Sequence, residues 1–204
     1  MSLVVSKIRR KLYLATALTC LTLATATGGY LGYLQWSGNF HTVIAGKFYR
    51  SAQPSAQQIA SYVHANGIRT IINLRGADDG KSWYRDEIEA SKALGVDHID
   101  FKMASSKILT PDRAEELLDI LRTAQKPIWI HCQSGADRTG LISVMYSNQV
   151  AGVAEETAEQ QLSIWYGHVG IPFLSKTYAM DESWHMFERK LNIEAKVTVD
   201  TRRL

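Results

Sequence analysis

Cysteine is scarce in this chain: only Cys20 and Cys132 occur among its 204 residues. Cys20 lies within a long apolar run, where it is most simply a small buried hydrophobic residue. With one cysteine left elsewhere, an intradomain disulfide and a cysteine-based zinc site are both excluded. A lone thiol in an oxidising compartment is a liability unless it does chemistry, which makes Cys132 the first candidate for a functional residue.

Acidic residues are absent from the first 34 positions, which carry Lys7, Arg9, Arg10 and Lys11. The rest of the chain holds the other 19 basic residues and all 20 acidic ones, a balance of −1. A nucleic-acid-binding protein carries its positive charge on the folded domain, so this class of partner is excluded. The basic excess belongs to the N-terminus.

Charge is also absent from the 23 residues 12–34. As a helix this segment would rise about 35 Å, enough to cross a hydrocarbon core of about 30 Å. Ala24-Thr25-Ala26 resembles a signal-peptide cleavage site, but the apolar run continues past it and ends near Trp36, a typical interfacial residue. The pattern favours a retained single-pass anchor, with a cleaved secretory signal as the alternative. In either case the basic cluster stays in the cytoplasm and the catalytic domain is placed in the periplasm.

Internal repeats and low-complexity tracts are absent, and from residue 35 onward apolar strand-like runs alternate with amphipathic helical ones. This alternation predicts an α/β fold with a central, mainly parallel sheet of about four or five strands flanked by helices, preceded by the N-terminal apolar helix. We expect three segments: an anchor or signal at 1–34, a catalytic domain at 35–192 and a C-terminal tail at 193–204. Strands are predicted at 48–50, 70–74, 96–103 and 127–131, and helices at 54–65, 83–94, 110–124, 138–150, 153–166 and 177–190.

Cys132 lies in a loop between a predicted strand and a predicted helix, at the sheet edge where α/β proteins bind ligands. The helix N-terminus offers free N–H groups and a partial positive charge, which suit phosphate. Gly135 permits a backbone turn that points successive N–H groups inward. Arg138 adds a planar two-pronged donor for phosphate oxygens, and these positive surroundings favour the thiolate of Cys132. A thiolate aimed at a bound phosphate is an activated nucleophile.

The segment His131-Cys132-Gln133-Ser134-Gly135-Ala136-Asp137-Arg138-Thr139-Gly140 resembles the Cys-x5-Arg signature of the protein tyrosine phosphatase superfamily, in its bacterial dual-specificity-like branch. The segments 48–54 and 72–75 are also similar to the start of this domain in bacterial members. The resemblance implies a phosphocysteine intermediate on Cys132, oxygens clamped by Arg138, and a thiolate stabilised by Thr139. It further implies that His131 orients the loop and that neither a metal nor a cofactor is required. Main-chain N–H groups of Gln133, Ser134, Gly135 and Ala136 would bind the substrate phosphate.

The general acid is the least determined residue, since family members carry an aspartate in the loop that corresponds to 103–109 and this chain has none. Asp112, Asp100 and Asp137 remain as candidates. Asp112 suits the first turn of a helix, and Asp100 lies near the end of a strand. Asp137 directly precedes Arg138, as in phosphoinositide phosphatases of the myotubularin and Sac types, and we favour it as the acid.

The sequence therefore predicts a phosphomonoester hydrolase of protein tyrosine or dual-specificity type, acting on a phosphorylated protein. A phosphoinositide or inositol phosphate phosphatase is the alternative substrate class, in which Arg75, Lys81 and Arg85 would engage further phosphates. A phosphate-binding module without turnover remains open because the usual loop acid is missing. Sulfur transfer by a rhodanese-like loop is disfavoured by the Arg138-Thr139-Gly140 ending.

Overall fold

The computed structural model describes the backbone of residues 2–201 and the side chains of residues 9–191. The chain forms two compact units, Met1–Ser37 and Gly38–Leu204. The first unit consists of one helix, α1 (Ser2–Trp36). Its segment Arg9–Trp36 is long and apolar enough to cross a membrane, with a mean hydropathy of 1.3, a criterion that signal sequences also meet. Five of its leucines are more than 60% exposed: Leu12, Leu14, Leu18, Leu21 and Leu23.

The second unit is built on a five-stranded sheet in the order β1-β2-β5-β3-β4. Strands β2 (Phe48–Ser51), β5 (Ile128–His131), β3 (Thr70–Asn73) and β4 (Asp97–Asp100) are parallel to one another. Only the edge strand β1 (His41–Ile44) is antiparallel, paired with β2. The predicted mainly parallel sheet is therefore confirmed.

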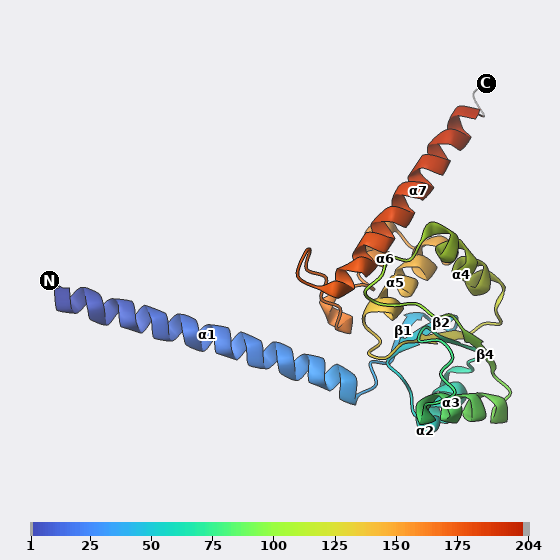
Figure 1. Ribbon diagram of the computed structural model, residues 1–204, viewed down its shortest axis with the longest axis horizontal. Helices are drawn as coiled ribbons and strands as arrows, with labels where there is room; N and C mark the ends of the chain where they lie inside the picture. Colours follow the sequence, from blue (N-terminus) through green and yellow to red (C-terminus); the bar gives the residue numbers. More distant parts are fainter. Residues whose placement is uncertain (1, 202–204) are drawn as a thin grey trace. The chain divides into compact units, whose positions relative to one another are not determined.

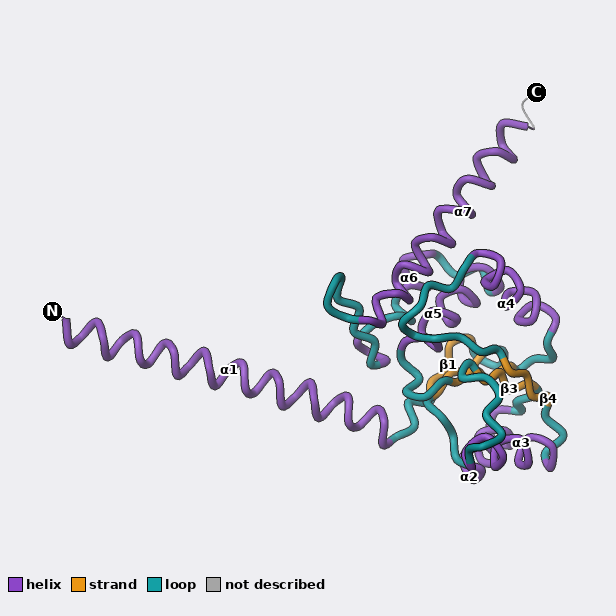
Figure 2. Tube along the Cα trace, in the orientation of Figure 1, coloured by secondary structure: helices purple, strands orange, loops and turns teal. Residues whose placement is uncertain are grey.

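Helices cover both faces of this sheet (Figure 1). One face carries α2 (Ala56–Asn66) and α3 (Ser82–Ala93), and the other carries α4 (Pro111–Thr123), α5 (Asp137–Met145), α6 (Glu155–Glu159) and α7 (Ala179–Thr201). Strand alternation supplies both cores: Ile71 and Trp129 pack toward α2, whereas Ile72 and Ile130 belong to the larger core with α4 and α5. Figure 2 shows the strands as a single layer between these two groups of helices.

The C-terminal part of the fold differs most from its prediction. The helix expected at 153–166 is limited to α6, followed by a turn and a short 3-10 segment, Ile164–Tyr166. The helix ends at Glu159, and two residues later the main-chain carbonyl of Gln161 accepts a hydrogen bond of 2.6 Å from the buried guanidinium of Arg50, which fixes this turn. The helix expected at 138–150 begins as α5 and continues as a π-helical turn, Tyr146–Val150. Helix α7 extends to Thr201, so the backbone of the expected tail is helical as far as that residue.

Candidate active site

The loop 132–136 connects the end of β5 to the start of α5, and the side chain of Cys132 within it is buried. Gly135 adopts a φ of 71°, a conformation that favours glycine. A Cβ atom there would lie 2.6 Å from the backbone nitrogen of Ala52 and from the carbonyl carbon of Ser51. The loop therefore packs directly on the backbone at the end of β2, and only glycine fits at this position.

Arg50, on β2, fixes the orientation of this loop through hydrogen bonds to its backbone. Its side chain is fully buried, and Nη2 donates to the carbonyl oxygens of Gly135 (2.8 Å) and Ala136 (3.4 Å). Two carbonyl groups of the loop are thus held toward Arg50. Because the N–H of a trans peptide points opposite to its carbonyl group, this arrangement suits an anion cradle on the other side, where the N–H of Ala136 donates to Oγ of Ser134 at 3.4 Å. The guanidinium also lies 4.0 Å over the ring of Tyr166. Burial lowers the pKa of Arg50 to about 10, although Tyr166 and Cys132 oppose this shift.

Asn39 ties the loop to the segment that follows α6. Its Nδ2 donates to the carbonyl oxygens of Ser134 (3.0 Å) and Tyr166 (2.9 Å). Neither Asn39 nor Arg50 was a site candidate in the sequence analysis. Arg50 did carry a signal, because a charged residue in a short apolar strand must find buried partners. Asn39 carried none.

Arg138 reaches from the start of α5 across the carboxyl ends of the neighbouring strands. Its Nη1 donates to the carbonyl oxygens of Leu74 (3.3 Å) and Met103 (3.2 Å). The buried Nε of Arg138 and the buried Oγ1 of Thr139 have no hydrogen-bond partner within the described residues. Buried donors are normally paired, so these two groups, six and seven residues after Cys132, suit a site that is completed by a ligand.

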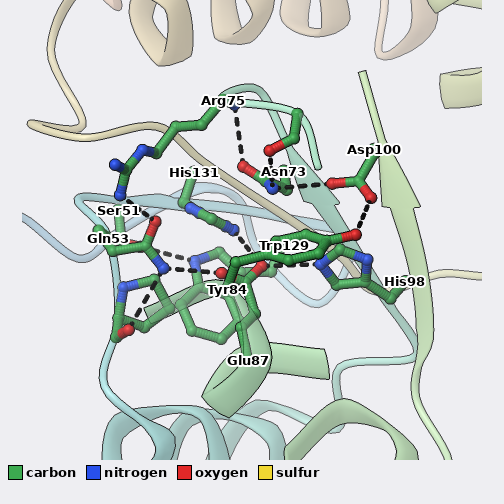
Figure 3. A network of polar contacts seen from close by, with 12 residues as sticks. Ser51, Gln53, Asn73, Arg75, Tyr84, Glu87, His98, Asp100, Trp129 and His131 are labelled. Carbon is green, nitrogen blue, oxygen red and sulfur yellow. Dashed lines mark hydrogen bonds and ion pairs between the residues drawn. The ribbon is translucent and has the colours of Figure 1, made fainter. Parts of the chain in front are cut away.

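A buried carboxylate, Glu87 of α3, supports the base of the site (Figure 3). Its Oε1 accepts from Nε2 of His131 (2.7 Å) and of His98 (2.8 Å), and its Oε2 accepts from Nε2 of Gln53 (2.7 Å). Burial by itself would raise the pKa of Glu87, but the charge and hydrogen bonds of these partners outweigh it and lower the pKa well below the usual range. The ionised Glu87 thus fixes His131, the residue before Cys132.

Asp100 lies at the end of β4, where its carboxylate is used in a structural network (Figure 3). Oδ1 accepts from Nδ2 of Asn73 (2.8 Å) and Oδ2 accepts from the hydroxyl of Tyr84 (2.5 Å). Burial and the Asp100 hydrogen bond raise the pKa of Tyr84, so this hydroxyl stays a donor. Asp112 is exposed in the first turn of α4.

Asp137 forms a cluster with two residues that are remote in sequence. Its Oδ1 lies 2.8 Å from Nδ1 of His168, and Nε2 of His168 lies 3.0 Å from Oδ2 of Asp181 on α7. Both nitrogens can donate only in a doubly protonated imidazole. Burial opposes that charge, but the hydrogen bonds and charges of both aspartates raise the pKa of His168 to about 9. His168 was not among the predicted site residues, because it is an isolated histidine 31 positions from Asp137.

The structure therefore brings most of the predicted site residues to one edge of the sheet. Cys132 is the first residue of the loop, and Asp137 and Arg138 lie at the start of α5. A parallel α/β sheet with a cysteine loop of this shape and an arginine six residues later defines the class of cysteine-based phosphatases. Residues 38–169 match the family model described as "DSP-PTPase phosphatase fused to NAD+ Kinase". The chain belongs to this family.

Among the curated relatives is the dual specificity protein phosphatase TpbA of Pseudomonas aeruginosa, 29% identical over 119 residues. The match covers 56% of this chain and 49% of TpbA, so the chain spans about half the length of the curated relatives it matches. The crystal structure of P. aeruginosa TpbA is similar with a TM-score of 0.54 and 22% identity, over 74% of this chain and 92% of that one. PTPMT1 gives a TM-score of 0.60 with 16% identity, over 77% and 98%. These solved structures support the fold.

Proposed function

We propose that the chain hydrolyses phosphate monoesters through a phosphocysteine intermediate on Cys132. The observation that carries this proposal is the cradle: Arg50 holds the carbonyl groups of Gly135 and Ala136 away from the cysteine, and Arg138 lies at its rim. The N–H groups of Gln133, Ser134, Gly135 and Ala136 would bind the phosphate oxygens, and Thr139 would donate to the thiolate.

In the first step the Cys132 sulfur attacks phosphorus and the bond to the leaving oxygen breaks. That oxygen receives a proton, and we assign the donor to Asp137 together with His168. His168, whose pKa is raised to about 9, carries the proton near neutral pH and shares a hydrogen bond with Asp137. Asp137 is the more exposed member, with 19% of its side chain accessible against 2% for His168, so the proton would leave through Asp137. Asp100 is disfavoured because Asn73 and Tyr84 already occupy its carboxylate.

In the second step a water molecule attacks the phosphocysteine. The sulfur–phosphorus bond breaks, its electron pair returns to Cys132 as a thiolate, and the proton of the water returns to the Asp137–His168 pair. Phosphate leaves and the protonation state of the site is restored. No residue outside the described site is needed for this cycle.

Hydrolysis of an aryl phosphate by the full chain in mild detergent tests the proposal. Cys132→Ser should abolish turnover, and Arg138→Lys should lower kcat/KM by roughly 10²-fold or more because a point charge replaces a two-pronged donor. The absence of turnover in the unaltered chain from pH 5 to 8, combined with phosphate binding, would favour the binding module instead.

The donor assignment is tested with leaving groups of different basicity. Asp137→Asn should lower kcat far more for an alkyl phosphate, which needs a proton, than for an aryl phosphate with an acidic leaving group. Asp100→Asn is the matched comparison, and it should affect both substrates equally. An Asp137→Asn variant that hydrolyses the alkyl phosphate at the original rate would contradict the assignment.

Phosphotyrosine-containing protein is our first substrate class, because TpbA is a dual specificity protein phosphatase and has been crystallised with pTyr. A phosphoinositide is the second class, because PTPMT1, a structural neighbour, has been crystallised with PI(5)P. A panel of phosphopeptides and phosphoinositides would rank them by kcat/KM.

We further propose that the apolar helix α1 anchors the chain in a membrane, with the catalytic domain at 35–192 in the periplasm and a cleaved signal as the alternative.

A further inference from the structure

Arg75 is the second residue after the end of β3, and it is held in one orientation at the edge of the candidate site. Its guanidinium stacks 3.5 Å over the ring of Trp83, and its Nη1 donates to Oε1 of Gln53 at 2.9 Å. Gln53 is fixed in turn by its hydrogen bond to the buried Glu87 (Figure 3). Arg75 is therefore half-buried and pre-oriented, unlike a flexible surface arginine.

Two residues near Arg75, its partner Gln53 and its chain neighbour Leu74, are hydrogen-bonded to the cysteine loop and to Arg138. The backbone N–H of Gln53 donates to the carbonyl oxygen of Gln133 at 3.2 Å. On the other side, the carbonyl oxygen of Leu74, one residue before Arg75, accepts the hydrogen bond from Arg138. The guanidinium of Arg75 thus lies beside the phosphate cradle, linked to it through one residue on each side.

The positive charge of Arg75 is not neutralised by an ion pair with any carboxylate among residues 9–191. The charges of Glu87 and Asp78 raise the pKa of Arg75 without an ion pair to it. The carboxylate of Glu87 is already hydrogen-bonded to two histidines and Gln53. Burial and the like charge of Arg138 lower the pKa of Arg75, although it remains a cation at neutral pH. Two neighbouring guanidinium groups that repel one another are stabilised when an anion binds to both.

The other two basic candidates from the sequence differ from Arg75. Lys81 and Arg85 are exposed on the loop and first turns of α3, and Arg85 Nη1 donates to the carbonyl oxygen of Asp79 at 2.8 Å. Neither has the stacking contact or the links to the cysteine loop that Arg75 has. The structure thus singles out one of the three.

We propose that Arg75 binds a second phosphate group of a bisphosphorylated polyol, free or as a lipid headgroup, while the first phosphate occupies the Cys132 loop. This inference rests on the proposed phosphatase function and develops its second substrate class, the phosphoinositides and their free headgroups. A fixed guanidinium held beside the cradle can discriminate a bisphosphate from a monophosphate, because only the bisphosphate can reach both Arg75 and Arg138.

The test compares kcat/KM for an inositol bisphosphate with kcat/KM for an inositol monophosphate, using the full chain in mild detergent. In Arg75→Gln the ratio of the two should fall roughly tenfold to a hundredfold, as expected for the loss of a hydrogen-bonded charge pair. Trp83→Leu keeps the charge but loses the stacking, so the ratio should fall by less. Arg85→Gln removes an exposed arginine of α3 and is the matched control, and it should leave the ratio unchanged.

A second arm presents the same two headgroups as phosphoinositides in vesicles. If Arg75→Gln lowers the kcat/KM ratio more with vesicles than with free inositol phosphates, the substrate is the lipid, and the reverse result indicates the free polyol phosphate. An unaltered ratio in Arg75→Gln, with aryl phosphate still hydrolysed, would overturn the inference and leave the proposed function intact. An Arg75 effect confined to doubly phosphorylated peptides would also overturn it. Loss of all hydrolysis in the unaltered chain would instead contradict the proposed function itself.

Discussion

At the scale of single residues, the candidate site depends on close approach between backbones. Gly135 adopts a φ of 71° and lies against the backbone of Ser51 and Ala52. Both the conformation and the space exclude a side chain. The loop that would bind phosphate is therefore shaped by the end of β2 as much as by its own sequence.

Gly135→Ala should destabilise the fold and lower activity together. The left-handed conformation alone costs about 1–2 kcal/mol for alanine, and the Cβ overlap displaces the loop further. We expect kcat/KM on an aryl phosphate to fall roughly a hundredfold because the cradle amides move out of position. Gly152→Ala is the control: it has a φ of 70° but nothing within 4 Å of the added Cβ, so only the backbone cost remains. Equal activity in the two variants would contradict the steric argument.

His168 gives a prediction about pH. The Asp137–His168 pair keeps its proton up to about pH 9 because the pKa of His168 is raised by both aspartates. In His168→Gln the carboxylates of Asp137 and Asp181 remain without the shared imidazolium, and an aspartate is ordinarily protonated only near about pH 4. The rate with an alkyl phosphate should therefore decline above about pH 9 in the unaltered chain and already below pH 7 in the variant. An aryl phosphate with an acidic leaving group serves as the control and should show a much smaller difference.

The same residue links pH to stability. The pKa of His168 is about 9 in the fold against an ordinary value of 6.5, so its contribution to stability is complete below pH 6.5 and is lost as the pH rises to 9. The size is on the order of 3 kcal/mol for a group this buried. Thermal unfolding of the full chain in detergent should show Tm decreasing more between pH 6.5 and 9 in the unaltered chain than in His168→Gln. Parallel decreases would show that His168 is not charged in the fold.

At the scale of elements, α3 is attached to the catalytic loop through one buried carboxylate, Glu87. Glu87→Gln removes the charge that pairs with His131 and His98 and should lower the free energy of unfolding by about 3 kcal/mol. Because the pKa of Glu87 is lowered in the fold, this contribution is present above about pH 4.3 and should be constant from pH 5 to 8. Glu89→Gln, exposed on the same helix, should change stability by less than about 0.5 kcal/mol. Denaturant unfolding measures both.

Elements with a strong local pattern were predictable from sequence. The apolar runs at 70–74 and 127–131 formed β3 and β5, and the Asn66-Gly67 pair ended α2 with Gly67 at a φ of 63°. The strand β1 and the early end of α6 were not predictable, because β1 is a short edge strand and α6 ends where Arg50 binds the carbonyl oxygen of Gln161. The local helix preference at this point competes with a hydrogen bond between Arg50 and Gln161, which are 111 positions apart in the sequence.

The candidate site shows the same division. Cys132, Asp137 and Arg138 lie within seven residues of one motif, so their proximity could be predicted from spacing alone. His168 and Arg50 reach the loop from other elements, and no periodicity in a single sequence connects them with it. The proposed proton donor therefore changes from a lone aspartate to a pair only when the fold is known.

At the scale of the whole molecule, the charge is divided along the chain: the first 34 residues carry +4 and the rest carries −1. Positive charge beside an apolar segment keeps that end in the cytoplasm. We therefore expect a C-terminal alkaline phosphatase fusion, which is active only in the periplasm, to be active in a bacterial host. Replacing Lys7, Arg9, Arg10 and Lys11 with glutamine should reduce this activity, whereas replacing four exposed basic residues of the domain should not: Arg69, Lys92, Lys102 and Lys107.

Whether α1 is retained is decided by the mass of the mature chain and its behaviour on membrane washing. A retained anchor predicts the full-length mass and resistance to extraction by alkaline carbonate, because at least 23 uncharged residues are held in the bilayer. A cleaved signal predicts a new N-terminus after Ala26 and a soluble periplasmic protein. Replacing Ala24 and Ala26 with leucine distinguishes the two independently: it should leave the anchored chain unchanged but would block processing of a secreted one. Cleavage after Ala26 would contradict the anchor and leave the phosphatase proposal untouched, since every residue proposed to act on phosphate lies beyond residue 38.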